Sequence, residues 1–175
     1  MRVYSFPVVI GVAPRILILG SMPGVASLEA GQYYAHPRNQ FWSIATRLCG
    51  AGGRLGYEGR LQMLREHHLA LWDVLHSCVR PGSLDAAIEH RTARPNDLLG
   101  LLRGAASIRR ICCNGGSAYS ALKRYFGQAL AADFPQIELC RLPSTSPANA
   151  SWSYARKLRA WEAALQVALD RPCSS

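Results

Sequence analysis

The chain has 175 residues, of which 49% are apolar and 18% are charged. This composition excludes a largely disordered protein, and the length fits one domain that spans residues 1–175. No apolar run approaches the roughly 18 residues that a membrane-spanning helix needs. We therefore expect a soluble protein of the cytoplasm, associated with the nucleoid if the source is bacterial, with no membrane partner.

The 20 Lys and Arg residues outnumber the 11 Asp and Glu residues, so the formal net charge is +9. All but two of these basic residues are arginines, whose guanidinium groups bind phosphate oxygens through forked hydrogen bonds. The charge is compatible with a nucleic acid partner. It is equally compatible with a GC-rich genome that encodes surface charge as arginine.

The six cysteines, at positions 49, 78, 112, 113, 140 and 173, form no CxxC pair. Their spacing matches no zinc or iron–sulfur pattern, and so scattered a set does not suggest a disulfide framework. Cys112, Cys113 and Cys140 lie in apolar runs and are expected to be small buried hydrophobes. We therefore predict no metal ion and no cofactor.

Short, mostly apolar runs alternate along the chain with segments of helical periodicity. In chain order we expect a strand at 15–19, helices at 39–49 and 57–67, a strand at 69–74, a strand at 108–113, a helix at 117–126, a strand at 137–142 and a helix at 151–169. Ser83 can cap a short helix through Ala87, and Pro95 suits the first turn of another.

Strands that alternate with helices predict an α/β fold, with a parallel sheet that carries helices on both faces. In such sheets the ligand binds at the carboxyl ends of the strands. The residues that end or follow the four expected strands therefore become the first candidates for a functional site. They begin at Gly20, Asp73, Asn114 and Pro143.

The first strand leads directly into Gly20-Ser21-Met22-Pro23-Gly24. Glycine and proline favour a tight turn, whose backbone N–H groups can face an anion or a carbonyl oxygen. The segment QYYAHPRNQFW follows at residues 32–42 and combines aromatic, amide and basic side chains. Such side chains stack on bases, hydrogen-bond to base edges and bind phosphates. The alternative is a loop whose aromatic rings only fill the core.

The fourth strand leads into LPSTSPANA at residues 142–150. Small hydroxyl side chains and two prolines give a stiff loop that can approach a DNA backbone and donate hydrogen bonds to phosphates. The alternative is an ordinary helix start, capped by Asn149 or by Ser151. The candidates for contact with DNA are Arg38, Ser144, Thr145, Ser146, Pro147 and Asn149, and Arg80 and Arg141 also flank the strand ends.

The GSMPG turn, the QYYAHPRNQFW segment and the LPSTSPANA loop resemble the uracil-DNA glycosylase superfamily, from about residue 16 to the last helix. The hypoxanthine-DNA (deoxyinosine) glycosylase branch looks most similar, and the mismatch-specific uracil-DNA glycosylases share the AHP-x-N-x-FW pattern. The resemblance implies a three-layer α/β/α fold around a four-stranded parallel sheet. It also implies a base excision repair enzyme that removes a deaminated base, hypoxanthine first, from DNA.

The chain also departs from other branches of this superfamily. Met22 stands where several branches place the Asp or Asn that activates water, and Ser21 stands where the iron–sulfur branch has Glu. Leu142 stands where several branches have His or Asn. The resemblance to the hypoxanthine branch instead matches its catalytic Asn to Asn39. An amide cannot act as a base, so Asn39 would orient a water that attacks after the base has left.

The resemblance and the strand ends together suggest a set of substrate-binding residues. Tyr34 would stack on the flipped base, and the Ser21–Met22 amides would bind a base carbonyl and its developing charge. His36 either hydrogen-bonds the base or water or pairs with a backbone carbonyl, and Asp73 either reads the base or is a buried carboxylate bonded to amides. Asn114 either contacts the base or DNA or shapes a turn. The full set is Gly20, Ser21, Met22, Pro23, Tyr34, His36, Asp73 and Asn114.

We expect a monomeric, monofunctional glycosylase that leaves an abasic site. A lyase step needs an amine nucleophile, and both lysines, Lys123 and Lys157, fall on predicted helix surfaces. One alternative is the same chemistry on uracil, since both bases present a carbonyl and an N–H on one edge. Another is a catalytically silent nucleic-acid-binding module, which Met22 and Leu142 favour. An unrelated hydrolase is disfavoured because no G-x-S-x-G elbow or P-loop is present.

Overall fold

In the computed structural model, which describes residues 1–169, four parallel strands form the main sheet in the order β3-β2-β6-β7. These strands are β2 (Ile16–Gly20), β3 (Leu69–Asp73), β6 (Arg110–Asn114) and β7 (Glu138–Leu142). The four-stranded parallel sheet is confirmed, and each strand begins and ends within two residues of its predicted position.

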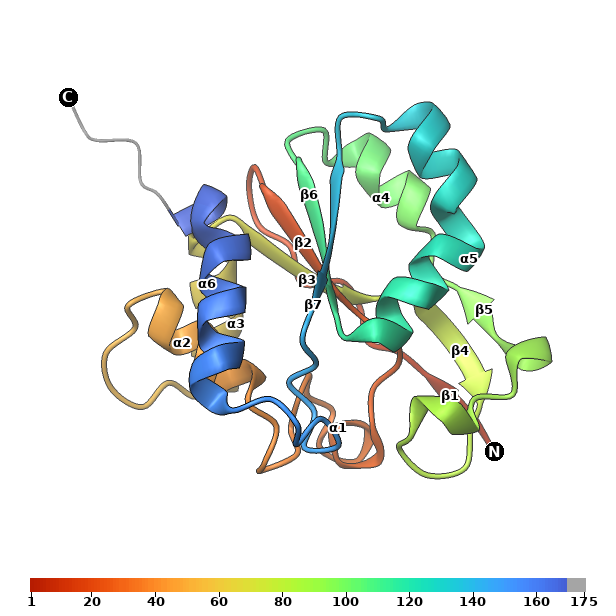
Figure 1. Ribbon diagram of the computed structural model, residues 1–175, viewed down its shortest axis with the longest axis horizontal. Coiled ribbons are helices and arrows are strands. Elements are labelled where there is room, and N and C mark those ends of the chain that lie inside the picture. The colour runs from red at the N-terminus through yellow and green to blue at the C-terminus, as the bar shows by residue number, and fades with distance from the viewer. Residues whose placement is uncertain (170–175) are drawn as a thin grey trace.

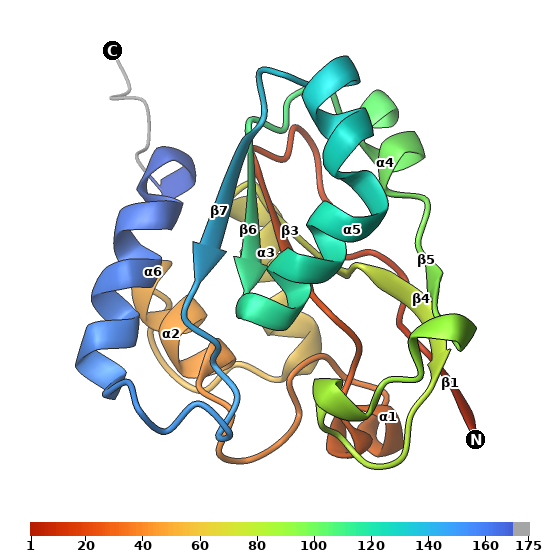
Figure 2. The ribbon, with the colours of Figure 1, turned by 45° about the vertical axis from the view of Figure 1, so that its right-hand side comes forward.

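Helices cover both faces of this sheet and make three layers (Figures 1 and 2). One face carries α2 (Phe41–Leu48), α3 (Tyr57–Glu66) and α6 (Tyr154–Leu169), and the other carries α4 (Leu98–Gly104) and α5 (Gly116–Asp133). Successive residues of β2 face opposite layers: Ile16 and Ile18 pack in one apolar cluster, Leu17 and Leu19 in the other. A strand buried on both faces needs a continuous apolar run, and this is why the strands were recognisable in the sequence.

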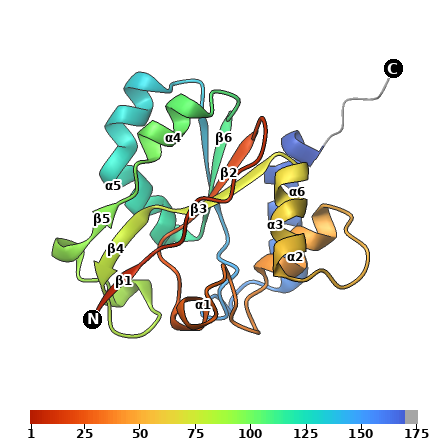
Figure 3. The ribbon, with the colours of Figure 1, turned by 180° about the vertical axis from the view of Figure 1, so that it is seen from behind.

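A second, antiparallel sheet was not predicted. It consists of β1 (Arg2–Tyr4), β4 (Leu75–Val79) and β5 (Arg94–Pro95), in the order β1-β4-β5. Only Val74 separates β4 from β3, so the expected strand at 69–74 continues into this second sheet (Figure 3). Pro95 therefore lies in a strand rather than in the first turn of a helix, and α4 begins three residues later.

Three further expectations about helices are corrected. A short helix, α1 (Val25–Ala30), follows the GSMPG turn and was not expected. Only a single 3-10 turn forms at Asp85–Ala87, and Ser83 does not cap it, since its Oγ accepts a hydrogen bond from Val25 N at 2.9 Å. Another 3-10 turn follows at His90–Thr92. Lys157 of α6 is only 3% exposed and does not lie on the helix surface.

Two features that would change the functional class are absent from residues 1–169, a membrane-spanning helix and a cluster of metal ligands. None of the helices in this part of the chain is long and apolar enough to cross a membrane. The same residues contain no group of three or more His, Cys, Asp or Glu side chains that could hold a metal ion. Cys49, Cys78, Cys112, Cys113 and Cys140 are free thiols, and Cys173 lies outside the described residues.

Candidate active site

The carboxyl ends of the parallel strands meet at a cavity of about 400 Å³. The strand register pairs Gly20 with Asp73 and Asn114 with Leu142, so these ends lie at one edge of the sheet. The arrows of β6 and β7 point to this edge in Figure 2. The predicted residues that line the cavity are Gly20, Ser21, Met22, Tyr34, Asn39, Asp73, Asn114, Ser144, Thr145, Ser146 and Asn149.

Four predicted site residues lie outside this lining: Pro23, His36, Arg38 and Pro147. His36 lines a neighbouring hollow together with Tyr34 and Asn39. Its Nδ1 accepts a hydrogen bond from the backbone N–H of Arg38 at 3.1 Å, whereas the alternative role expected for it was pairing with a backbone carbonyl. Arg38 itself is exposed and remains accessible to a large ligand.

Gly20, Asp73 and Tyr34 form the floor of the cavity. A Cβ atom on Gly20 would lie 2.4 Å from Asp73 Oδ1 and 3.1 Å from the Tyr34 hydroxyl, so only glycine fits between them. Asp73 Oδ2 and the Tyr34 hydroxyl are both buried, and neither has a hydrogen-bond partner within residues 1–169. Buried polar atoms are normally paired, so this floor offers two polar atoms to a bound ligand.

The electrostatics of the floor follow from its burial. Asp73 is 4% exposed, and burial together with the nearby Asp85 carboxylate raises its pKa to about 8, against the opposing effect of Arg80. Burial and Asp73 likewise raise the pKa of the Tyr34 hydroxyl. At neutral pH both groups therefore carry a proton, and each can donate a hydrogen bond as well as accept one.

Tyr34 is held in an unusual backbone conformation by the aromatic residues around it. Its φ of 54° lies in the left-handed region, which is uncommon for a residue other than glycine and is often found at functional sites. Its ring stacks on Phe41 at 4.1 Å between centroids. The preceding Tyr33 donates its N–H to the Tyr57 hydroxyl and accepts from Trp42 Nε1. Three aromatic residues of this segment, Tyr33, Phe41 and Trp42, therefore fill the core and position Tyr34, and the stacking of Tyr34 on a base stays a prediction.

Asn39 is fixed where two loops meet. Its Oδ1 accepts a hydrogen bond from Phe41 N at 2.9 Å at the start of α2, and its own N–H donates to His36 O at 2.8 Å. The next residue, Gln40, donates its N–H to Thr145 O at 3.0 Å, which joins this loop to the loop after β7. The hydrogen bond from Phe41 N uses one lone pair of Oδ1. The second lone pair and the amide nitrogen can bind a water molecule.

Asn114 and Thr145 hold the loop after β7 through a reciprocal pair of hydrogen bonds. Asn114 Nδ2 donates to Thr145 Oγ1 at 2.9 Å, and Thr145 N donates to Asn114 Oδ1, also at 2.9 Å. Thr145 is completely buried, so the prediction that it contacts DNA is corrected: it anchors the loop from inside. Asn114 belongs to the same anchor, and neither of its two sequence-based roles accounts for these bonds.

The turn after β2 lines the cavity, but its side chains mostly pack or hydrogen-bond within the protein. The Met22 side chain packs in the apolar cluster on the α4 and α5 face of the sheet. Ser21 Oγ donates to Asp85 Oδ2 at 2.6 Å. Pro23 was expected to bind substrate, but it is buried behind the turn, where its carbonyl accepts from Arg80.

One wall of the cavity was missed in the sequence. It is the loop between β4 and the first 3-10 turn, and it contributes Ser83, Leu84, Asp85 and Ala86. Arg80 begins this loop, and the prediction that it contacts phosphate is wrong, because the residue is only 3% exposed. No local pattern marks these residues as part of a site. Their role depends on contacts to a turn that lies about sixty residues earlier.

Comparison with known proteins decides the family. The model of the uracil DNA glycosylase superfamily matches residues 7–166. The chain belongs to this superfamily. A protein named hypoxanthine DNA glycosylase from Methanosarcina acetivorans is 36% identical over 162 residues, which are 91% of this chain and 95% of that protein. One of the same name from Methanosarcina barkeri is 39% identical over 90 residues, 51% of this chain and 57% of that one.

The fold comparison agrees with this assignment. A solution NMR structure of a proposed uracil DNA glycosylase from Methanosarcina acetivorans superposes with a TM-score of 0.79 at 33% sequence identity. The superposition covers 96% of this chain and 99% of that one. The resemblance inferred from the three motifs is therefore confirmed, and so is the α/β fold that it implies.

The narrow floor of this glycosylase cavity makes a prediction about stability. Gly20→Ala should lower the free energy of unfolding by about 1–3 kcal/mol, because the new Cβ would overlap Asp73. The matched control is Gly127→Ala in α5, whose Cβ would make only ordinary contacts, and there we expect a gain of up to about 1 kcal/mol. Urea denaturation measures both. A Gly20→Ala variant as stable as the wild type would contradict the close packing described here.

Proposed function

We propose that this chain is a DNA glycosylase that hydrolyses the N-glycosidic bond of hypoxanthine in DNA and leaves an abasic site. The observation that carries the proposal is the cavity floor, where the buried Asp73 carboxyl and Tyr34 hydroxyl lie without partners in residues 1–169, on the same cavity as Asn39. The names of the two Methanosarcina relatives support hypoxanthine as the first substrate to test.

The cavity can distinguish a deaminated base by the polarity of its edge. Hypoxanthine presents a carbonyl oxygen and a neighbouring N–H, whereas adenine presents an amino group and a bare nitrogen. A protonated Asp73 carboxyl can pair with either edge, because it carries both a donor and an acceptor. Backbone N–H groups only donate, so those of the Ser21–Met22 turn would donate to the carbonyl oxygen of hypoxanthine and would repel the amino group of adenine. The N–H groups of the turn therefore favour hypoxanthine over adenine, and the Asp73 carboxyl pairs with the rest of the base edge.

The chemistry of the site favours departure of the base before attack by water. Two carboxyl groups of the described residues line the cavity. Asp73 is protonated at neutral pH, and Asp85 accepts from Ser21 Oγ and lies 3.8 Å from Arg80 Nη1, so neither is left as a free base beside Asn39. The C1′–N9 bond would break first, and its electron pair would leave with the base, whose charge the turn N–H groups stabilise. Asn39 would then hold a water against the cationic sugar. The water oxygen bonds to C1′, and its proton is released to solvent.

The face around the cavity fits a DNA partner. The chain carries a net charge of +9, and Arg38 and Arg141 are exposed beside the loops that line the cavity. The loop after β7 presents Ser144, Ser146 and Asn149 at the cavity rim and is held rigidly by its own hydrogen bonds. These residues remain our candidates for contact with the DNA backbone, together with Pro147 next to them.

Two labelled duplexes test this function, one with a single deoxyinosine and one with a single deoxyuridine. Each is incubated with the protein and then treated with alkali, which cuts at abasic sites. We expect cleavage at deoxyinosine to be the faster, and no cleavage before alkali is added. An otherwise identical duplex with deoxyadenosine is the control.

Each other outcome has a definite meaning. Faster cleavage at deoxyuridine would keep the enzyme class but replace the substrate. Strand breaks without alkali would contradict a monofunctional enzyme. Retained binding with no cleavage of either duplex would favour the silent binding module.

A further inference from the structure

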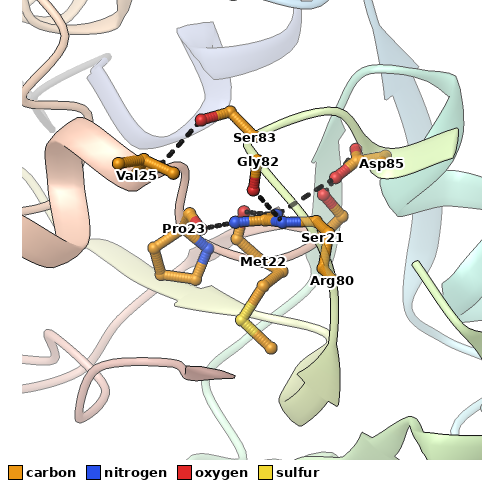
Figure 4. Close-up of polar contacts among 8 residues, drawn as sticks. All are labelled: Ser21, Met22, Pro23, Val25, Arg80, Gly82, Ser83 and Asp85. Atoms are coloured by element: carbon orange, nitrogen blue, oxygen red, sulfur yellow. Dashed lines mark hydrogen bonds and ion pairs between the residues drawn. The ribbon is translucent and has the colours of Figure 1, made fainter. Parts of the chain in front are cut away.

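Arg80 is a charged residue whose side chain is completely shielded from solvent. Its guanidinium donates hydrogen bonds to three backbone carbonyls, those of Met22, Pro23 and Gly82 (Figure 4). Asp85 Oδ1 lies 3.8 Å from Arg80 Nη1 and provides a partly exposed counter-charge. Removing a charge from water is costly, and an apolar residue of similar size is often at least as stabilising. The position of Arg80 therefore calls for an explanation beyond stability.

The contacts of Arg80 continue a row of carbonyl groups that are all held on one side of the turn. The carbonyls of Gly20 and Ser21 accept hydrogen bonds of 2.8 and 3.1 Å from the backbone N–H groups at the β3–β4 junction. The next two carbonyls, of Met22 and Pro23, accept from Arg80. Four consecutive carbonyl oxygens are thus directed towards β4 and the loop that follows it.

The opposite side of the turn is set by the geometry of the peptide bond. In a trans peptide the N–H points away from the C=O of the same unit, and every peptide in the described residues is trans. With the carbonyls fixed, the N–H groups of Ser21, Met22 and Gly24 are directed to the other side. Gly20, Ser21 and Met22 line the cavity, so these N–H groups belong to backbone that borders the space for the base.

The guanidinium also places a charge next to the turn. A carbonyl that accepts a hydrogen bond from a cation polarises its own peptide, so through the Pro23 carbonyl Arg80 polarises the Gly24 N–H, whereas the Met22–Pro23 peptide has no N–H. On the Ser21 and Met22 N–H groups Arg80 acts by holding the backbone and through its nearby positive charge. The departing base carries negative charge in the reaction proposed above. We propose that Arg80 is a positioning residue for base departure, which holds the Gly20–Gly24 turn with its donors towards the base and places a buried positive charge behind that turn. This inference rests on the proposed glycosylase function.

The surrounding contacts suit this role. Asp85 binds both the arginine and the hydroxyl of Ser21, so one carboxylate ties the guanidinium to the turn that it supports. Ser83 accepts from Val25 N at 2.9 Å and fixes the end of the same turn. Lysine could not reproduce the three directed bonds, because its ammonium is a compact charge without the fork of a guanidinium. It would retain the positive charge.

Arg80→Met and Arg80→Lys together test the inference. For Arg80→Met, single-turnover cleavage of deoxyinosine DNA should be slower by about 10²-fold, comparable to the loss of one donor from an oxyanion hole. The dissociation constant for the same duplex should change less than about threefold, because the buried side chain makes no contribution to the salt-dependent phosphate contacts. Arg80→Lys should recover about tenfold of the lost rate, since it restores the charge but not the geometry.

The controls separate this role from a structural one. Arg103→Met removes an exposed arginine from α4 and should leave the rate unchanged. Rates are expressed per folded molecule, from circular dichroism and thermal denaturation. Should Arg80→Met fail to fold, Arg80→Gln provides the second neutral variant and the same rate loss is expected.

Two results would overturn the inference. A folded neutral variant that cleaves at the wild-type rate would show that Arg80 only stabilises the fold. A wild-type protein that cleaves no deaminated base would instead overturn the proposed function, and the role of Arg80 with it. The wild-type measurement comes first, so the two failures cannot be confused.

Discussion

Asn39→Ala is expected to lower the rate of deoxyinosine cleavage by about 10²- to 10³-fold, which would be the largest effect of any single substitution in the cavity. The reason is geometric: Asn39 Oδ1 is fixed by its hydrogen bond to Phe41 N, so a water bound to the same amide has a defined position. Alanine removes both the acceptor and the donor. Single-turnover cleavage of the deoxyinosine duplex measures the loss.

The hydrogen bond that Asn39 Oδ1 accepts from Phe41 N must be separated from its role in the reaction. Loss of one such hydrogen bond costs about 1 kcal/mol, so Asn39→Ala should also be slightly less stable. Asn39→Asp keeps an oxygen that can accept from Phe41 N and from water, and we expect it to be more active than Asn39→Ala. Equal rates for the wild type and a folded Asn39→Ala variant would exclude Asn39 as the residue that positions water.

The second large effect concerns Asp73 and pH. The pKa of its carboxyl is about 8 in the folded protein, above the usual 3.8. Between about pH 4 and pH 8 the folded protein keeps a proton that the unfolded chain has lost. The contribution of this carboxyl to the free energy of unfolding therefore falls as pH rises from about 4 to about 8. Above about pH 8 it no longer changes with pH. The free energy of unfolding should fall with pH more steeply in the wild type than in Asp73→Asn, as urea denaturation at several pH values would reveal.

The rate of deoxyinosine cleavage should also depend on the ionisation of the Asp73 carboxyl. Above about pH 8 the Asp73 carboxylate loses its donor and places a negative charge beside the leaving base, so cleavage should fall by about tenfold per pH unit. Asp73→Asn retains a donor and an acceptor at every pH, and its rate should not show this fall. Circular dichroism at pH 9 confirms that both proteins remain folded. Identical pH profiles for the two proteins would remove Asp73 from base recognition.

Local patterns in the sequence were sufficient to predict the main sheet. The run that became β2 is apolar and buried on both faces, and those of β3, β6 and β7 are mostly apolar. Arg110, Glu138 and Arg141 are the charged residues within β6 and β7. The three motifs follow these strands or lie between them, so the rule that ligands bind at the carboxyl ends of parallel strands located the cavity. Asp73 and Asn114 were found in this way, as last residues of strands.

The second sheet was not predicted, because its strands have too little local pattern in the sequence. Strand β1 has three residues and β5 has two, and both pair with β4 across more than seventy and about twenty residues of chain, respectively. Strands this short carry little periodicity of their own. The sheet directs the loop from Arg80 to Ala86 against the GSMPG turn, so one wall of the cavity was missed with it.

By itself, the sequence determined the family, the parallel sheet, and the segments that meet at its carboxyl edge. These properties depend on residue types and spacings that are local in the chain. Only the tertiary structure decided which side chains face the cavity and which support it. Thr145 and Arg80 look like surface contacts in the sequence, yet both are buried because their partners, Asn114 and the turn at Met22–Pro23, lie 31 and 57 to 58 residues away. Whether a polar residue binds a ligand or holds a loop depends on such distant partners, and no local pattern encodes them.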